Sequence, residues 1–310
     1  RLTGIHAVDL PLNDKKVLGL FSSPEPLDLA PNQIRGVNTG TLGIPEFGTR
    51  FVRQMLEDTK PSTMAELIRI SGLSHGTDVW LNNAQDLILQ GICKLNDCFC
   101  TRDDIMNYLL LQGGDPLMSF KTMESVRKGR GLTPEMEEHM QKLNIPEWFV
   151  TSCKKIKYMF PRAHAAAYVM MAFRVAYYKV HLPLAFYSVY FTVRADAFDL
   201  AQASGGAERV LKNIKALKAK GNDIETKEAD LLVILEVVYE MNLRGIELLP
   251  IDLMRSKAKR FTIEGNAIRP PFSSIAGVGG MLPLALKKRK AEGLLLLWKT
   301  SACAQKQTAP

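Results

Sequence analysis

The sequence has no long apolar run and no leader segment. The apolar stretch from His164 to Phe173 is about half of the ~20 residues that a bilayer-spanning helix needs, and Arg174 closes it. No basic-then-apolar leader precedes Leu2, and the first residue is Arg1 rather than Met. The sequence therefore predicts a fragment without a signal peptide, a transmembrane helix or a membrane partner.

Cysteine is scarce, and its spacing makes a poor disulfide framework. The five cysteines are odd in number and unevenly spread, which predicts a reducing, cytoplasmic location. Cys93-x4-Cys98-x-Cys100 could be part of a zinc site, but no second ligand pair follows at a usable spacing. We expect buried or loop thiols here and no structural zinc.

The composition is that of a globular protein with a directional charge. Hydrophobic residues make up 46% and charged residues 23% of the 310, which excludes wholesale disorder and collagen-like repeats. This length favours two domains. Residues 1–150 carry 15 basic and 19 acidic side chains, a balance of −4, and residues 151–310 carry 25 and 13, a balance of +12. The net charge of +8 therefore belongs to the C-terminal half.

The pattern of apolar, Pro and Gly residues predicts a mainly α fold with a small β element. Residues 1–48 are rich in turns, and helical periodicity begins after Gly48. Strands are predicted at 251–256 and 260–269, the second with a turn at Glu264-Gly265-Asn266. The helices predicted from helix-start and helix-stop signals span 64–71, 79–89, 102–112, 116–128, 134–143, 146–159, 163–180, 184–194, 204–221 and 226–245.

The most interpretable local motif begins at Ile275. Two glycines around one apolar residue, Gly277-Val278-Gly279, are followed by an apolar helix and the basic run 287–290. This arrangement is the helix-hairpin-helix pattern. The backbone amides exposed at such a turn can bind a nucleic-acid phosphate. The alternative is a plain helix-turn-helix packing element with a solvated charged face.

A second basic concentration surrounds aromatic residues. Cations at 127–131 and 154–157 bracket Tyr158, Phe160 and Tyr168. Such a mixture suits a site that holds a phosphate and a base ring together. The alternative is that the cations complement helix dipoles and that the aromatic stripe belongs to the core.

Two further groups of polar residues are interpreted as structural. Ser74-His75 could be a nucleophile and its base, but adjacent side chains rarely face each other and no third orienting group is visible. We expect a loop with a helix cap at Thr77. Asp103 and Asp104 could bind a metal, but two acids in the first turn of a helix are expected for dipole reasons alone.

Four blocks of sequence, in unbroken order, closely resemble the PolC-type DNA polymerase III alpha subunit, the C-family replicase of low-GC Gram-positive bacteria. The resemblance extends over about residues 2–297. The blocks are GTLGIPEFGTRFVRQML at 40–56, ISGLSHGTDVW at 70–80, MESVRKG at 123–129 and KKIKYMFPRAHAAAY at 154–168.

The resemblance implies a division of the chain and roles for particular residues. It implies an extended palm-to-fingers connection at 1–48, helical fingers at 49–200, a helical and β connecting region at 201–269 and a duplex-binding helix-hairpin-helix at 270–297. The residues implied near the incoming nucleotide are Ser74, His75, Phe160, His164 and Tyr168. The candidate triphosphate contacts are Arg127, Lys157 and Arg162. The implied contacts to duplex phosphates are Gly277, Val278, Gly279, Lys287 and Lys288.

The resemblance also implies a reaction and partners. In this family the primer 3′-hydroxyl attacks the α-phosphorus of a deoxynucleoside triphosphate, with two Mg²⁺ ions held by palm aspartates that lie outside this chain. Primer–template DNA and dNTP are the implied ligands, and a sliding clamp and other replisome subunits would bind through parts not present here. This chain alone is expected to be inactive. The alternatives are a non-catalytic helix-hairpin-helix DNA-binding protein and a protein-interaction scaffold.

The tail departs from the family pattern after Gly293. Back-translating 298–308 and reading one nucleotide earlier permits Val-Glu-Asp-Leu-Arg-Val-Arg-Ala-Lys-Ala-Asn, which resembles the missing segment. We expect a frameshift near 294–297 and an aberrant tail at 298–310. Resequencing the underlying DNA tests this hypothesis.

Overall fold

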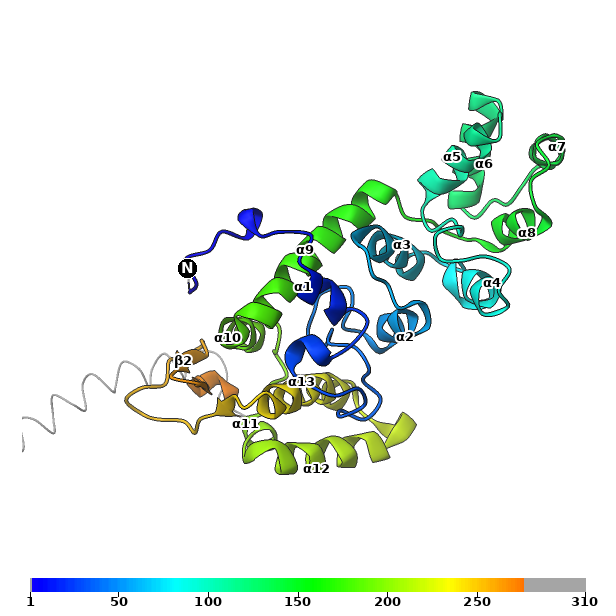
Figure 1. Ribbon diagram of the computed structural model, residues 1–310. Coiled ribbons are helices and arrows are strands. Elements are labelled where there is room, and N and C mark those ends of the chain that lie inside the picture. Colours follow the sequence, from blue (N-terminus) through cyan, green and yellow to red (C-terminus); the bar gives the residue numbers. More distant parts are fainter. Residues whose placement is uncertain (1, 276–310) are drawn as a thin grey trace, which may run out of the picture. The chain divides into compact units, whose positions relative to one another are not determined.

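The computed structural model describes residues 2–275 and divides into two compact units, residues 5–180 and residues 181–275 with the first few residues (Figure 1). Both units are dominated by helices, and the sheet among the described residues has three short strands, which confirms the predicted mainly α fold with a small β element. No helix within this part of the chain is long and apolar enough to cross a membrane. The predicted helix-hairpin-helix contacts Gly277, Val278, Gly279, Lys287 and Lys288, and the predicted tail at 298–310, lie outside the described residues.

Short helices, several of them with side-chain caps, build much of the unit at 5–180. A reciprocal capping box between Thr63 and Glu66 starts one helix, and Pro116 and Pro134 each follow a capping residue at the start of another. The elements are η1 (Ala7–Asp9), α1 (Lys15–Leu20), η2 (Glu25–Leu27), α2 (Arg50–Thr59), α3 (Met64–His75), η3 (Trp80–Ala84), α4 (Gln85–Leu89), α5 (Arg102–Leu111), α6 (Pro116–Arg127), α7 (Pro134–Lys142), α8 (Glu147–Lys155) and α9 (Arg162–His181).

Helix α9 and the turn-rich first segment share one core. The buried rings of Phe21 and Phe47 meet edge to face at 5.0 Å, and Phe21 stacks on Phe173 of α9 at 6.3 Å. The fully buried Lys179 Nζ, also on α9, donates hydrogen bonds to the carbonyls of Gly40 (2.7 Å) and Leu42 (2.6 Å). The long helix therefore fixes the path of the loop that leads into α2.

Two predicted helices are wrong over part of their length. The prediction at 79–89 fails at 81–83, where the backbone dihedrals are not helical and Asn82 has φ +56°. Asn83 Nδ2 donates to the Asp78 carbonyl (2.9 Å), and Lys155 Nζ donates to the Asn82 carbonyl (2.7 Å), so side chains hold this kink. The prediction at 146–159 fails after Lys155, because the chain there becomes extended and pairs with Thr77.

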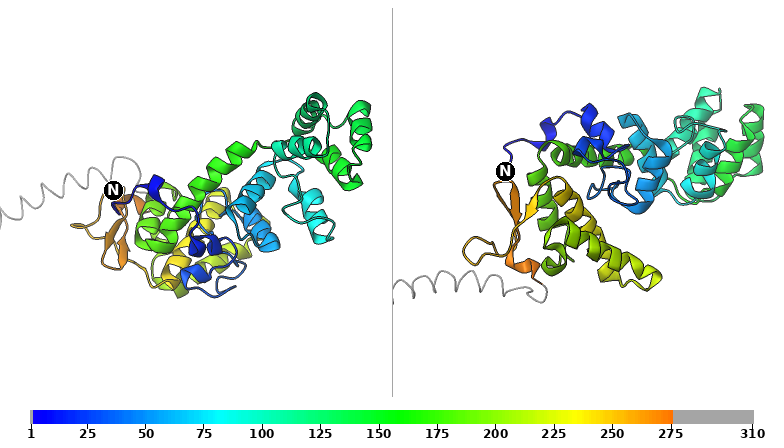
Figure 2. Two further views of the ribbon diagram at one scale, coloured as in Figure 1. Left: turned by 45° about the horizontal axis from the view of Figure 1, so that its top comes forward. Right: turned by 60° about the horizontal axis from the view of Figure 1, so that its bottom comes forward.

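The unit at 181–275 packs helices beside a small sheet, and α12 and α13 lie side by side in the views of Figure 2. The sheet has the order β1-β3-β2, with β1 parallel and β2 antiparallel to β3. The elements are α10 (Pro183–Val193), α11 (Leu200–Ala203), α12 (Gly206–Ala219), η4 (Gly221–Asp223), α13 (Thr226–Leu243), β1 (Glu247–Leu248), β2 (Thr262–Glu264), β3 (Ala267–Arg269) and η5 (Phe272–Ser274).

One of the two strand predictions is confirmed. The segment 260–269 forms the β2–β3 hairpin, with Gly265 at φ +60° in the predicted turn. The strand predicted at 251–256 is wrong, because Asp252 Oδ1 accepts hydrogen bonds from the backbone N–H of Met254 (2.7 Å) and Arg255 (2.9 Å) and so closes a local turn. The first strand of the sheet is β1, a few residues earlier.

Candidate functional site

The ends of α3 and α6 converge on the extended connection between α8 and α9. The end of α3 reaches it through Thr77, whose N–H donates to the Tyr158 carbonyl at 2.9 Å. The end of α6 reaches it through Arg127, whose carbonyl accepts from the Met159 N–H at 3.3 Å. The turn after α6 also approaches closely at Gly129, where a Cβ would lie 2.5 Å from a carbonyl oxygen of the connection. Sequence blocks that are far apart thus meet in one place.

A row of rings lies along this junction. The ring of Phe160 lies 5.1 Å from that of His75 and 4.6 Å from that of His164, and His164 lies 4.5 Å from Tyr168, one turn later on α9. Tyr158 meets Phe160 edge to face at 5.8 Å. Tyr158 and Tyr168 are 41% and 37% exposed, so the row faces solvent and is not part of the core. Exposed neighbouring rings suit stacking on a base.

Oxygen atoms orient His75 and Ser74. His75 Nδ1 lies 2.7 Å from the Ser71 carbonyl and 3.1 Å from Ser74 Oγ, and its Nε2 lies 2.5 Å from a carboxylate oxygen of Glu46. The expectation that Ser74 and His75 do not face each other, and that no third group orients the histidine, is therefore wrong. Ser74 Oγ donates to the Ser71 carbonyl at 3.0 Å, so the pair is not an activated nucleophile.

The predicted cap at Thr77 is also wrong. The residue that precedes η3 is Val79, and helix α3 includes both Ser74 and His75. Thr77 instead forms a backbone bridge with Tyr158. The segment therefore connects the end of α3 to the aromatic row.

A cationic cluster lies at the end of α6. Glu124 accepts a forked pair of bonds from Arg127 Nε and Nη2, the latter at 2.9 Å, and also lies 2.9 Å from Lys128 Nζ and 3.8 Å from Arg102 Nη1. Hydrogen bonds from Arg127 and Lys128 lower the pKa of Glu124 to about 2. Three cationic side chains thus surround one carboxylate, so this group of four side chains carries a net positive charge.

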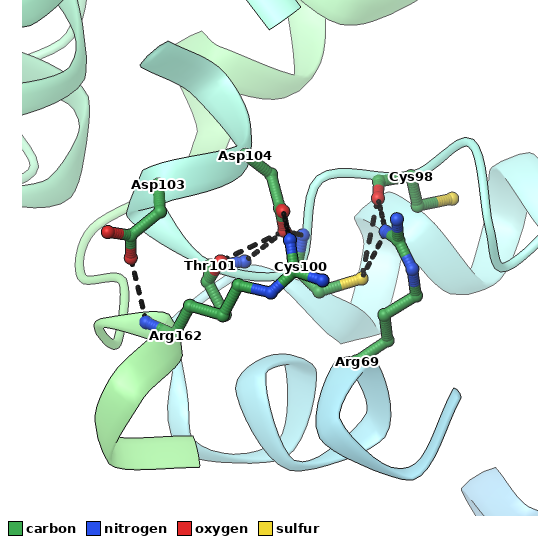
Figure 3. A network of polar contacts seen from close by, with 7 residues as sticks. All are labelled: Arg69, Cys98, Cys100, Thr101, Asp103, Asp104 and Arg162. Carbon is green, nitrogen blue, oxygen red and sulfur yellow. Dashed lines mark hydrogen bonds and ion pairs between the residues drawn. The ribbon is translucent and has the colours of Figure 1, made fainter. Parts of the chain in front are cut away.

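A polar network joins α5, the cysteine-containing loop and α9 (Figure 3). Asp104 Oδ2 accepts from the N–H of Cys100 and of Thr101, both at 2.9 Å, and closes a capping box at the start of α5. Asp103 accepts from the Arg162 N–H at 2.7 Å, and Arg162 Nη1 lies 3.5 Å from Asp104 Oδ1. The two aspartates make structural contacts, as predicted.

The described residues contain no group of three histidine, cysteine or carboxylate side chains that could hold a metal ion. The Sγ atoms of Cys93 and Cys98 lie 2.8 Å apart, and Arg69 Nη1 contacts the Cys98 carbonyl and the Cys100 sulfur. Burial raises the pKa of Cys100 to about 12 and raises that of Cys98 as well. These thiols are buried, as predicted, and are poor nucleophiles in this state.

The residues that were predicted to contact the nucleotide have different surroundings in the structure. Of the candidate triphosphate contacts, Arg127 is held by Glu124, Lys157 is exposed and packs against Gly129, and Arg162 faces the first turn of α5. The predicted residues that form or adjoin the aromatic row are Ser74, His75, Phe160, His164 and Tyr168.

Sequence reasoning gave no individual role to Glu46, Arg102, Glu124 or Lys128. Glu124 lies three residues before Arg127 and four residues before Lys128. This helical spacing predicts ion pairs, so the sequence could have indicated a role for Glu124. Arg102 and Glu46 come from distant segments, and no local pattern points to them.

Comparison with known proteins identifies the family. A profile of the bacterial DNA polymerase III alpha subunit finger domain matches residues 1–145. The chain is 54% identical over 295 residues to the PolC-type DNA polymerase III of Bacillus subtilis, and 54% identical over 292 residues to that of Caldanaerobacter subterraneus subsp. tengcongensis. With the same enzyme of Thermotoga petrophila the identity is 51% over 292 residues. The chain belongs to the PolC-type DNA polymerase III family.

The match extends over nearly all of this chain but over a small part of its relatives. It covers 95% of this chain and 20% of the Bacillus subtilis protein, and 94% and 21% for the other two. This chain therefore spans about a fifth of the length of the curated PolC-type relatives it matches. The resemblance inferred from the four sequence blocks is confirmed.

Proposed function

We propose that this chain supplies the nucleotide side and part of the duplex-binding surface of a bacterial replicative DNA polymerase. The aromatic row beside a cationic cluster supports this, because a base can stack on rings while phosphates meet cations. In this proposal the fingers extend over 49–200, residues 1–48 connect them to a palm, and 201–269 lead to the helix-hairpin-helix at 270–297. The residues near the base are Ser74, His75, Phe160, His164 and Tyr168, and those near the triphosphate are Arg127, Lys157 and Arg162.

The proposed chemistry is nucleotidyl transfer to a primer 3′-hydroxyl. The described residues contain no group of three histidine, cysteine or carboxylate side chains that could hold a metal ion, and Asp103 and Asp104 are engaged in capping α5 and in binding Arg162. As the family resemblance implies, the proposal assigns the two ions to palm carboxylates outside this chain, and no catalytic step to the residues here. The working location is the cytoplasm, with clamp and replisome partners bound elsewhere. The proposed contacts to the phosphates of the duplex are Gly277, Val278, Gly279, Lys287 and Lys288.

The first test measures what the chain does alone. Purified chain, primer–template duplex, dNTPs and Mg²⁺ are combined, and we expect weak duplex binding that falls with added salt and no primer extension. Measurable nucleotide incorporation would overturn the assignment of the metal-binding carboxylates to other parts of the protein. Absence of any salt-dependent duplex affinity would favour an interaction scaffold.

The second test addresses the aromatic row. Tyr168→Ala removes an exposed ring at the end of the row and should weaken dNTP binding, measured by calorimetry, by about tenfold. Phe120→Ala is the matched control, because Phe120 is a ring on α6 that is 49% exposed and lies outside the row. Equal dNTP affinity of the two variants contradicts the proposed base site.

A further inference from the structure

One carboxylate in the proposed site contacts more cations than it can neutralise. Glu124 is held by the fork of Arg127 and by Lys128 Nζ at 2.9 Å, and Arg102 Nη1 lies 3.8 Å away. Three cations and one carboxylate leave a net positive charge. The cations come from the start of α5 and the end of α6, two helices that pack on each other. The cluster is therefore a fixed cationic position with a carboxylate at its centre.

Solvent reaches every member of this cluster. The exposed fractions of the side chains are 33% for Arg102, 24% for Arg127, 41% for Lys128 and 21% for Glu124. An anion from solution can therefore approach the donors that now face Glu124. Arg127 has further N–H groups beyond those that bind Glu124, and the lysine ammonium has more than one donor.

Backbone contacts place the cluster next to the aromatic row. The Arg102 N–H donates to the Phe160 carbonyl at 3.0 Å, and the Met159 N–H donates to the Arg127 carbonyl at 3.3 Å. Two of the residues that contact Glu124 are thus bonded to the segment that carries the rings. This arrangement matches a ligand that has a ring at one end and several phosphates at the other.

We propose that Glu124 is an internal counter-anion, which occupies the polyphosphate position while no ligand is bound. When a polyphosphate ligand displaces the Glu124 carboxylate, Arg102 and Lys128 join Arg127 as contacts to the phosphates. This inference rests on the proposed nucleotide site and names the residues that take its phosphate end. Phosphate oxygens accept the same forked bonds from arginine that a carboxylate accepts. A polyphosphate carries several negative charges, so it displaces the single carboxylate of Glu124. Before the ligand binds, that carboxylate holds the three cations together.

The test is calorimetric titration of the full chain with inorganic tripolyphosphate. Glu124→Gln removes the competing charge, and we expect it to bind tripolyphosphate more tightly than wild type by about threefold or more. Glu138→Gln is the matched control, because it makes the same charge change at a carboxylate that pairs with Lys142 on α7 at 2.8 Å. The affinity of this control should stay close to that of wild type.

Each outcome decides for or against the counter-anion role. Equal tightening by Glu124→Gln and Glu138→Gln, or weaker binding by Glu124→Gln, overturns the role of Glu124 without affecting the proposed nucleotide site. No binding of tripolyphosphate by wild type overturns both that role and the phosphate end of the site. A failure of Tyr168→Ala to weaken dNTP binding counts against the base end alone, because tripolyphosphate has no ring.

A second variant covers the case in which Glu124→Gln does not fold. Arg102→Gln leaves the fork between Glu124 and Arg127 in place and should weaken tripolyphosphate binding. Lys142→Gln makes the same charge change at an exposed lysine on α7 and should not weaken it. Equal affinities of these two variants overturn the assignment of Arg102 and, with it, the proposed displacement.

Discussion

At the scale of single residues, Gly129 allows two backbone segments of the site to approach each other closely. Its φ of +68° is disfavoured for other residues, and a Cβ would meet the Lys157 carbonyl oxygen at 2.5 Å. Gly129→Ala should lower the free energy of unfolding by about 3 kcal/mol, from backbone strain and steric overlap together. The measurement is urea unfolding followed by circular dichroism.

A neighbouring glycine separates strain from overlap. Gly131 has φ +74°, but nothing lies within 4 Å of the position that a Cβ would take, so Gly131→Ala should cost only about 1 kcal/mol. If the two variants lose the same stability, the close packing of Gly129 on Lys157 is not what fixes the junction.

A buried lysine makes the second prediction at this scale. Lys179 Nζ donates to the Gly40 and Leu42 carbonyls in a fully buried position. Lys179→Met keeps the length and apolar stem but removes both hydrogen bonds, and we expect a loss of about 3 kcal/mol in the free energy of unfolding. The exposed Lys142→Met is the control, with less than about 0.5 kcal/mol expected. Similar losses in urea unfolding would show that Lys179 does not hold the loop.

At the scale of elements, two adjacent aspartates at the start of α5 make different contacts (Figure 3). Asp104 accepts from the Cys100 N–H, the Thr101 N–H and the Thr101 hydroxyl, whereas Asp103 accepts from the Arg162 N–H. Asp104→Ala should therefore cost about 2 kcal/mol and Asp103→Ala about 1 kcal/mol in denaturant unfolding. The reverse order would mean that the contact with α9 matters more than the cap.

Helix starts were predictable because their signals are local. The helices that begin at Met64, Pro116 and Pro134 start where capping residues and prolines predict them, since each cap lies close in sequence to the bonds it makes. The end of α8 was not predictable in this way. Its continuation pairs with Thr77, and a partner so distant in sequence leaves no periodic signal.

In the candidate site, too, contacts between residues close in sequence were predictable and contacts between distant segments were not. His164 and Tyr168 lie on one face of α9, and the spacing of Glu124, Arg127 and Lys128 is that of helical ion pairs, so these groups could be read from sequence. The approach of the α3 histidine to the ring row, and of the α5 arginine to the α6 carboxylate, depends on how separate segments pack. Only the resemblance to a known family brought the blocks at 70–80 and 154–168 together.

At the scale of the whole molecule, carboxylates in both units are held ionised by the groups around them. Hydrogen bonds from cations lower the pKa of Glu124 and Glu138 in the unit at 5–180 and of Glu228 and Glu264 in the other. Backbone N–H groups of Arg255 and Met254 lower the pKa of Asp252. Each of these groups binds its proton less readily in the folded chain than in the unfolded chain.

The sign of the pH effect follows from these shifts. A carboxylate whose folded pKa is lowered contributes stability that is present above its unfolded pKa, about 4, and is lost as the pH falls through the folded value. For Glu124 that value is about 2. The midpoint of urea unfolding should therefore be nearly constant from pH 7 to about 5 and should fall steadily from about 4 toward 2. Glu124→Gln has no such group to protonate, so its midpoint should start lower and fall less steeply. A midpoint that is flat or rises between about pH 5 and 3 would show that these ion pairs do not stabilise the fold.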